Sequence, residues 1–408
     1  MHRSLRDPGN SGTQHEKDSS RINRAKVTRL KALARLSIVG AVVVFLLVTG
    51  LFLVERRHGA SSSGGSNSFR NSAEPVSKGS SVVPKQSSTT AKSFSRPSDL
   101  DHSHTSSTPT TYQIGETSYT FVDRSRTVTI DGEVEPLTLP TRVLYPEVTI
   151  RGTLQPAKGP FPLIVFAPGY LQCRSSYAPL LDHWTAAGYV VAAIQFPLTN
   201  CHVVGKPEEW EVINQPADIA FVISSLLARS NSSSSRIASL IDPSEIGIAG
   251  HSDGGDTVAA VAANTCCRDE LVKAAVVMAG SELASYPGRY FSGKTPPILF
   301  IQGSADRVND PQDSLEMYEE DNQGPKWYLD LLGAGHFLPY EGDDPPEPLV
   351  AAVSTDFFDL YLKGDSAAAA QMYHLGNEAG VAQLFSASEV GSSDEYGEPE
   401  QSTEQAQR

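Results

Sequence analysis

The run Gly-His-Ser-Asp-Gly-Gly at residues 250–255 constrains this chain more than any other stretch of it. It follows an apolar segment, 246–249, that has the composition of a buried strand, and a helical pattern begins just after it. In such a sharp turn Ser252 takes strained backbone angles, and Gly250 and Gly254 leave room for the close approach of the backbone. The run therefore predicts a nucleophilic serine at the end of a strand. The helix N-terminus behind it favours developing negative charge.

Between about residues 117 and 364, short apolar segments alternate with longer helical ones. Segments such as 163–167 are apolar on both faces, which is typical of parallel strands covered by helices. We therefore expect an α/β fold with antiparallel leading strands, a mostly parallel sheet and helices on both faces. Its reactive loops should lie at the carboxyl ends of the strands. The expected strands are 127–130, 141–145, 163–167, 190–194, 246–249, 274–278, 298–301 and 326–331, and the expected helices are 177–187, 216–228, 256–264, 311–320 and 349–362.

A serine hydroxyl needs a base to react near neutral pH, and histidine is the usual one. The chain has ten histidines, of which five lie outside the expected fold. His251 adjoins Ser252 but points the wrong way for the base of such a turn. His336 lies in the glycine-rich run Gly-Ala-Gly-His-Phe after the last expected strand, where the loop is free to place an imidazole beside the serine. We predict that His336 is the base.

The acid that orients such a base should follow the penultimate expected strand. Asp306 lies just past the segment 298–301, and it is the acid that we predict. Asp310 and Glu282 are rivals, but Asp310 comes later in the same loop and Glu282 follows an earlier strand. The nucleophile, the acid and the base then occur in the order serine, aspartate, histidine, which is the order of one large fold of hydrolases.

Two backbone N–H groups are needed to stabilise the oxyanion that forms when a serine attacks a carbonyl. One should come from the residue after the nucleophile, Asp253, and the other from the loop after an earlier strand. The run Pro-Gly-Tyr-Leu at 168–171 follows the strand 163–167, and Tyr170 is the donor that we expect there. The ring of Tyr170 either lines the substrate cleft or packs as an ordinary aromatic side chain.

Together, the segment 162–195, the turn around Ser252 and the loops of Asp306 and His336 resemble the α/β-hydrolase superfamily. More narrowly, they are similar to the bacterial cutinase/polyester-hydrolase, chlorophyllase and platelet-activating-factor-acetylhydrolase-like serine esterases. The resemblance covers about residues 143–363. It implies an α/β-hydrolase fold and a Ser-Asp-His carboxylesterase that uses no metal and no organic cofactor.

Two positions depart from the pattern of these families. Asp253 stands where polyester hydrolases typically have methionine and chlorophyllases arginine. The loop after 276–278 reads Ala-Gly-Ser-Glu and lacks the tryptophan that helps to clamp polyester substrates. Both departures argue against a polyester as the substrate, and the carboxylate of Asp253 favours an ester that is neutral or positively charged nearby.

The four cysteines are too few for a scaffold built on disulfides. Cys173 and Cys201 fall on loops after successive expected strands, and we predict a disulfide between them that braces the oxyanion loop. Cys266 and Cys267 are adjacent, so a strained bridge, two free thiols and two separate pairings all remain open. We expect no metal site, because no spacing of histidines and cysteines suits zinc.

The two ends of the chain lie outside the expected hydrolase domain, 112–385. Residues 1–36 carry nine Lys and Arg against three Asp and Glu, and the uncharged stretch 37–54 would span about 27 Å as a helix, roughly the hydrocarbon core of a bilayer. We predict a transmembrane helix there, with a cytoplasmic N-terminal arm, in a single-pass protein of the cell membrane. A cleaved signal peptide is the rival interpretation. We expect disorder in the Ser/Thr-rich tether 55–111 and the acidic tail 386–408.

The formal net charge of -14 excludes nucleic acid as the main partner. The expected partners are an ester or lipid-like small molecule and, through residues 37–54, the membrane. We therefore expect a membrane-anchored extracytoplasmic serine hydrolase that cleaves carboxylic esters through an acyl-enzyme. The alternatives are a catalytically inactive binding module on the same fold and an acyltransferase that acts on an envelope acceptor. Turnover of an ester panel tests the first alternative, and product analysis with added alcohols tests the second.

Overall fold

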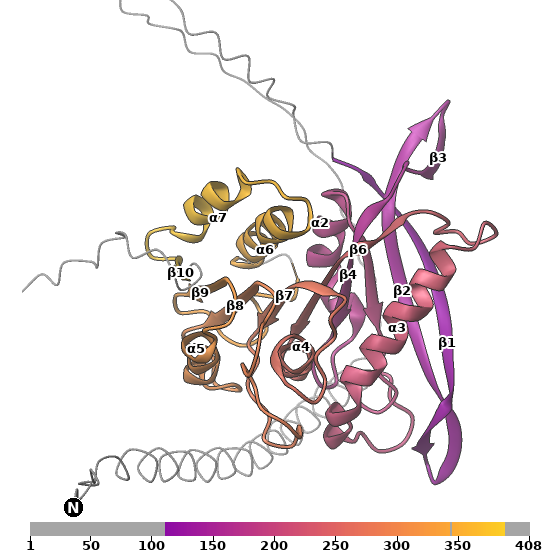
Figure 1. Ribbon diagram of the computed structural model, residues 1–408, viewed down its shortest axis with the longest axis horizontal. Coiled ribbons are helices and arrows are strands. Elements are labelled where there is room, and N and C mark those ends of the chain that lie inside the picture. Colours follow the sequence, from indigo (N-terminus) through magenta and orange to yellow (C-terminus); the bar gives the residue numbers. More distant parts are fainter. Residues whose placement is uncertain (1–110, 343–344, 388–408) are drawn as a thin grey trace, which may run out of the picture. The chain divides into compact units, whose positions relative to one another are not determined.

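The computed structural model describes residues 111–342 and 345–387 of the chain (Figure 1). One ten-stranded sheet has the order β1-β2-β5-β4-β6-β7-β8-β9-β10, and β3 pairs with β2 beside this path. The strands are β1 (Gln113–Ile130), β2 (Glu133–Ile150), β3 (Thr153–Pro156), β4 (Phe161–Ala167), β5 (Val190–Ile194), β6 (Ile241–His251), β7 (Val272–Met278), β8 (Ile298–Gly303), β9 (Lys326–Leu331) and β10 (Ala382–Ala387). The helices are α2 (Ala178–Ala186), α3 (Gln215–Ser230), α4 (Asp253–Ala263), α5 (Pro311–Glu320), α6 (Glu347–Leu362) and α7 (Ala368–Gly376), with two short 3₁₀ helices, η1 (Arg174–Tyr177) and η2 (Glu209–Asn214).

The middle of the sheet is parallel and its edges are antiparallel. The six neighbouring strands β5, β4, β6, β7, β8 and β9 all run in the same direction. The β1–β2 hairpin joins antiparallel to β5 on one side, and β10 joins antiparallel to β9 on the other. This topology confirms the expected mostly parallel sheet with antiparallel leading strands. It brings the carboxyl ends of the parallel strands to one edge of the sheet.

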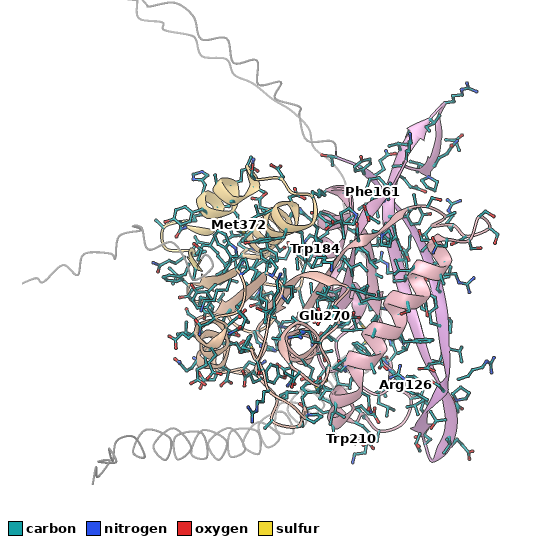
Figure 2. The ribbon with its side chains drawn as sticks, viewed as in Figure 1. Arg126, Phe161, Trp184, Trp210, Glu270 and Met372 are labelled. Atoms are coloured by element: carbon teal, nitrogen blue, oxygen red, sulfur yellow. A yellow bond between two sulfur atoms is a disulfide. The ribbon has the colours of Figure 1, made fainter. Side chains whose placement is uncertain are left out.

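Each face of the sheet buries its own hydrophobic cluster. In β4, Leu163 and Val165 pack in the cluster under α3, α4 and α5, whereas Ile164 and Phe166 pack in the cluster under α2, α6 and α7. Side chains of a strand alternate between the two faces, so an apolar run such as that of β4 must be covered by helices on both sides. The labelled side chains of Figure 2 include members of both clusters, among them Phe161 of the first and Trp184 of the second. The expected helices on both faces are confirmed.

The main differences from the expected elements lie at the two edges of the sheet. The predicted strands 127–130 and 141–145 are parts of a hairpin whose two strands have 18 residues each. Pro136 and Pro140 lie within β2 and interrupt the pattern of a strand, although an edge hairpin tolerates proline. Strand β10 and helix α7 were not predicted, because their exposed positions blur the apolar periodicity on which such a prediction depends.

The predicted transmembrane helix at 37–54 lies outside the described residues, as do the arm 1–36, the tether up to residue 110 and the tail from residue 388. The tail was expected to begin at residue 386, but Ser386 and Ala387 form the end of β10, where they pair with β9. Within the described parts of the chain, no helix has both the length and the apolar composition needed to cross a bilayer.

Candidate active site

Ser252 lies at the turn between β6 and α4, with backbone angles φ 56° and ψ −123°. This left-handed conformation is strained for a serine. The strain is held by hydrogen bonds on both sides, because the Ser252 N–H donates to the Met278 carbonyl over 3.0 Å and the Ser252 carbonyl accepts from the Asp256 N–H over 2.9 Å. The turn therefore has a fixed shape, which keeps the hydroxyl at the carboxyl edge of the sheet.

The glycines of the turn are required by its geometry. A Cβ atom at Gly250 would lie 2.1 Å from the carbonyl oxygen of Gly254, and one at Gly254 would lie 1.9 Å from the carbonyl oxygen of Ala167. Both contacts are far inside the van der Waals limit and involve backbone atoms, which cannot move aside without displacing β4 or α4. Glycine at these two positions lets the first turn of α4 pack directly against the end of β4.

The three side chains predicted to react form one row of hydrogen bonds. The Nε2 atom of His336 lies 3.0 Å from the Oγ atom of Ser252, and its Nδ1 atom lies 2.7 Å from Oδ2 of Asp306. All three residues are at least nine-tenths buried. They follow the ends of β6, β8 and β9. His336 is 84 residues from Ser252 and 30 residues from Asp306 along the chain.

The loop that carries His336 is positioned by a close approach to the end of β8. A Cβ atom at Gly303 would lie 2.5 Å from the carbonyl oxygen of Ala334, so only glycine allows this contact. The same carbonyl accepts a hydrogen bond of 2.9 Å from the N–H of Ala305. The acid and the base are thus held side by side through their own backbones, before any side-chain contact is counted.

Asp306 is surrounded by hydrogen-bond donors. Its Oδ1 atom accepts from the N–H groups of Val308 and Asn309 over 2.8 and 3.0 Å, and its Oδ2 atom accepts from the amide of Gln302 over 3.0 Å. Burial alone would raise the pKa of the Asp306 carboxyl, but the hydrogen bond and the charge of His336, together with these backbone donors, hold it below its ordinary value. Asp306 therefore remains a carboxylate. The rival Asp310 caps α5 instead, where its side chain accepts from the N–H of Gln312.

The loop after β4 passes beside the serine. A Cβ atom at Gly169 would lie 3.1 Å from the Cβ atom of Ser252, and the N–H of Gln172 closes a turn by donating to the Gly169 carbonyl over 3.1 Å. Tyr170 is the second residue of this turn, and Asp253 is the first residue of α4, whose N–H lies at the start of the helix. The two predicted oxyanion donors therefore belong to two backbone segments that adjoin Ser252.

The model of the PET hydrolase-like family matches residues 145–370, which is more than half of the chain and contains every residue of the site. This chain belongs to the PET hydrolase-like family. Its fold is also that of a ferulic acid esterase from Streptomyces cinnamoneus, with a TM-score of 0.50 and 22% identity over 64% of this chain and 93% of that one. No curated protein matches the chain.

The predicted disulfide of this PET hydrolase-like protein is confirmed. Cys173 and Cys201 are bonded, with their Cα atoms 5.0 Å apart, and the N–H of Leu171 donates to the Thr199 carbonyl over 2.7 Å in the same pair of loops. The loop after β4 is thereby fastened to the loop after β5. Cys266 and Cys267, whose state the sequence left open, are bonded to each other.

The side of the site that Tyr170 faces is acidic. Burial raises the pKa of the Tyr170 hydroxyl to about 12, and three nearby carboxylates add to the shift. They belong to Glu209, Asp253 and Glu208, of which the first and the last lie at the start of η2. A substrate that lies against Tyr170 therefore meets a negative potential.

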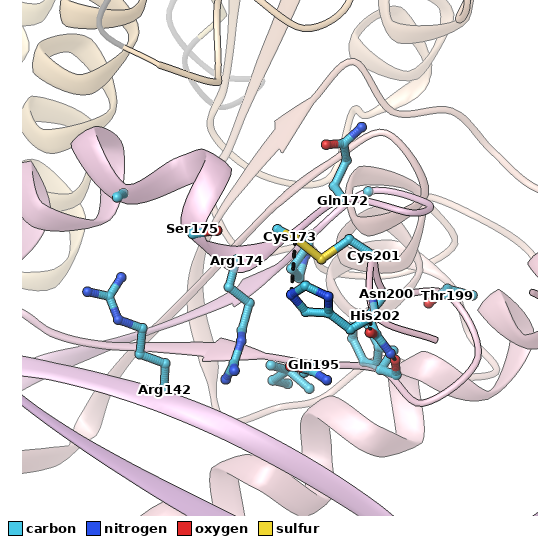
Figure 3. Close-up of a pocket in the computed structure, with 15 residues that line it drawn as sticks. Arg142, Gln172, Cys173, Arg174, Ser175, Gln195, Thr199, Asn200, Cys201 and His202 are labelled. Carbon is cyan, nitrogen blue, oxygen red and sulfur yellow. Dashed lines mark hydrogen bonds between the residues drawn. A yellow bond between two sulfur atoms is a disulfide. The ribbon is translucent and has the colours of Figure 1, made fainter. Parts of the chain in front are cut away.

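A cavity of about 230 Å³ lies around the Cys173–Cys201 bridge (Figure 3). Arg142 and Arg174 line it, but both are engaged in the fold. Arg142 forms an ion pair of 2.9 Å with Glu116, and Arg174 donates to two backbone carbonyls. His202 lies beside the bridge, yet the two sulfur atoms are bonded to each other and are not available as thiolate ligands for a metal. None of the three reactive side chains lines this cavity.

Two residues of the site were not identified from the sequence. His251 was interpreted only as a residue unsuited to be the base, and Tyr177 was placed at the start of a helix without a role. In the structure both are fully buried, and they are hydrogen-bonded to each other over 2.8 Å beneath the reactive row. The contact joins residues 74 positions apart, and no local pattern in the sequence signals it.

Proposed function

We propose that this PET hydrolase-like protein hydrolyses carboxylic esters with Ser252 as the nucleophile, His336 as the base and Asp306 as the residue that orients the base. The observation that carries the proposal is the unbroken row of hydrogen bonds from Ser252 through His336 to Asp306, at a turn with the backbone strain of a nucleophilic serine. Membership of an ester-hydrolase family supports the same reaction class.

The geometry supports a role for each of these residues in the proposed reaction. The carboxylate of Asp306 accepts the Nδ1–H of His336, so the lone pair of Nε2 points at the hydroxyl of Ser252. His336 takes the proton as Ser252 attacks the ester carbonyl, and the backbone N–H groups of Tyr170 and Asp253 hold the oxyanion. The alcohol leaves with the proton from His336. Water activated by His336 then releases the acid from the acyl-enzyme.

The acidic side of the site sets the substrate class. Glu208, Glu209 and Asp253 are close enough to raise the pKa of the Tyr170 hydroxyl, so an ester with a carboxylate near the reacting carbonyl is repelled. We propose that the substrates are neutral or positively charged esters. No cofactor is required by these steps, because the nucleophile, the base and the oxyanion donors all belong to the protein.

Covalent labelling tests the nucleophile directly. A fluorophosphonate should label the wild-type chain at Ser252, as read by mass spectrometry of the labelled peptide, and Ser252→Ala should lose both the label and hydrolysis of p-nitrophenyl butyrate by a factor of about 10⁴ or more. Ser281→Ala, on the loop after β7, provides a matched serine control that should keep the label. Labelling of the Ser252→Ala variant would exclude the proposed nucleophile.

The same assay separates the alternatives. A labelled wild-type chain that turns over none of a panel of esters would favour the binding module. Formation of new esters when alcohols are added, in preference to free acid, would favour the acyltransferase. Hydrolysis with free acid as the main product is the outcome that we expect.

We also propose that residues 37–54 anchor the enzyme in the cell membrane, with residues 1–36 in the cytoplasm. The support is the uncharged apolar stretch and the basic residues that precede it. The full chain should stay in the membrane pellet after alkaline washing and enter detergent. A protease added outside intact cells should remove the hydrolase domain and leave the N-terminal arm. Release of the full-length domain into the medium would favour the cleaved signal peptide instead.

A further inference from the structure

We propose that His251 is a positioning residue, which acts together with Tyr177 to tie the oxyanion loop to the backbone of the catalytic histidine through a directed chain of hydrogen bonds. The inference rests on the proposed function and assigns a role to the second residue of the Gly-His-Ser-Asp-Gly run. Neither His251 nor Tyr177 contacts the reacting atoms in the mechanism above.

The direction of the chain follows from what each group can donate. The Nε2 atom of His251 lies 2.8 Å from the carbonyl oxygen of His336, which can only accept, so Nε2 carries the proton. In a neutral ring Nδ1 is then an acceptor, and the Tyr177 hydroxyl, 2.8 Å away, must donate to it. The Tyr177 oxygen in turn accepts from the N–H of Gly169 over 3.3 Å. Each hydrogen bond therefore has one direction, from the Gly169 N–H through Tyr177 and, by way of the His251 ring, to the His336 carbonyl.

Burial keeps His251 in this single form. Its ring is fully buried and packs against the rings of Tyr340 and His336, with centroids 4.6 and 4.7 Å away. Burial and the neighbouring His336 hold the pKa of His251 well below its ordinary value, so the ring stays neutral while the enzyme works. A neutral histidine of fixed tautomer presents one donor and one acceptor on opposite sides, which is what a link between two loops requires.

The chain of hydrogen bonds ends at the Gly169 N–H and at the His336 carbonyl. These are the two parts of the site whose relative position must be kept. Gly169 precedes Tyr170, whose N–H is the proposed oxyanion donor, and the carbonyl of His336 belongs to the base itself. His251 immediately precedes Ser252, so the link runs through the residue next to the nucleophile. Small errors in the relative position of a base and an oxyanion donor cost rate much more than they cost binding. Loss of the link should therefore lower kcat and leave KM nearly unchanged.

Three variants separate the parts of the link. Tyr177→Phe removes only the hydroxyl; His251→Gln keeps a donor near the position of Nε2 but loses the ring acceptor; and His251→Leu removes both. With the full chain in detergent and p-nitrophenyl butyrate as the substrate, we expect kcat to fall about 10-fold in the first two and further in His251→Leu, with KM within about twofold of wild type. The double variant Tyr177→Phe/His251→Gln should be no slower than either single variant, because both break the same link.

A matched control removes a hydroxyl of the same kind elsewhere. Tyr189→Phe loses the part-buried hydrogen bond from the residue before β5 to Asp359 of α6, which involves none of the reactive residues, and should keep wild-type kcat. Melting temperatures of all variants show whether each is folded at the assay temperature. A Tyr177→Phe enzyme that is folded and has wild-type kcat would overturn the proposal.

Nitrogen NMR of the full chain labelled at histidine gives a readout that does not depend on activity. We expect His251 to show the neutral Nε2–H tautomer between about pH 5 and pH 9, and its Nδ1 resonance to shift in Tyr177→Phe. A proton on Nδ1, or an imidazolium above pH 5, would also overturn the proposal. The two proposals fail separately. An unlabelled, inactive wild type contradicts the esterase, whereas an active, labelled wild type with an unaffected Tyr177→Phe variant contradicts only the positioning role.

Discussion

The geometry of the site requires the burial of single ionisable side chains as well as a strained backbone at Ser252. Glu341 shows this clearly, because it lies beside the Tyr177 hydroxyl and one of its carboxylate oxygens, Oε1, is buried without a hydrogen-bond partner among the described residues. Burial raises the pKa of the Glu341 carboxyl from 4.5 to about 7. The folded protein therefore holds a proton on this carboxyl that the unfolded chain has already lost.

The sign of the resulting pH dependence is fixed. Because the pKa of Glu341 is higher in the folded state, its contribution to the free energy of unfolding is complete below about pH 4.5 and is lost as the pH rises to about 7. Glu341→Gln should keep that contribution at every pH. We expect its melting temperature to exceed that of the wild type by roughly 2–4 °C at pH 8, the change that about 1 kcal/mol causes in a domain of this size. The two should coincide near pH 4.5, and a difference of the same size at both pH values would contradict the assignment.

At the scale of elements, the site depends on how firmly the loop after β4 is joined to the loop after β5. The Cys173–Cys201 bridge closes a separation of 28 residues, which in the chain-entropy description stabilises the fold by about 3.5 kcal/mol. Cys173→Ser/Cys201→Ser should lose about that much and should lower kcat several-fold, because the Tyr170 N–H is no longer held. Cys266→Ser/Cys267→Ser is the matched control, since that bridge joins adjacent residues and closes no loop. Stability is measured by thermal denaturation and kcat with p-nitrophenyl butyrate. Equal losses of kcat in both double variants would argue against a role for the Cys173–Cys201 bridge in the oxyanion loop.

The elements also show why sequence patterns predicted the site better than the fold that surrounds it. The turn at Ser252 and the loops of Asp306 and His336 have local signals, namely glycines at fixed positions after apolar strands. Of the long β1–β2 hairpin, the sequence predicts only two short segments, because the alternation of apolar and polar residues is broken by prolines and by positions exposed on both sides. The His251–Tyr177 contact could not be predicted, since it depends on how α2 and its neighbours pack and not on any neighbour in sequence.

At the scale of the whole molecule, the formal charge of -14 and the carboxylates around Tyr170 act in the same direction. Three p-nitrophenyl esters with similar acyl chains test this: the neutral butyrate, the cationic 4-(trimethylammonio)butyrate and the anionic monosuccinate. At low salt we expect kcat/KM of the anionic ester to be about tenfold below that of the neutral one, and the gap to shrink as added salt screens the charges. Glu209→Gln should narrow the same gap at low salt. An anionic ester that is hydrolysed as well as the neutral one would contradict the proposed substrate class.

The burial of α4 has a consequence for how such an enzyme can change. All residues from Gly254 to Ala263 are buried, and its first turn lies so close to β4 that no side chain fits at Gly254. A helix enclosed in this way offers almost no position at which variation is tolerated. We therefore expect new substrate preferences to arise outside α4, at positions in the surrounding loops other than the reactive residues and the oxyanion donors. A library for directed evolution should therefore vary those loop positions and leave α4 unchanged.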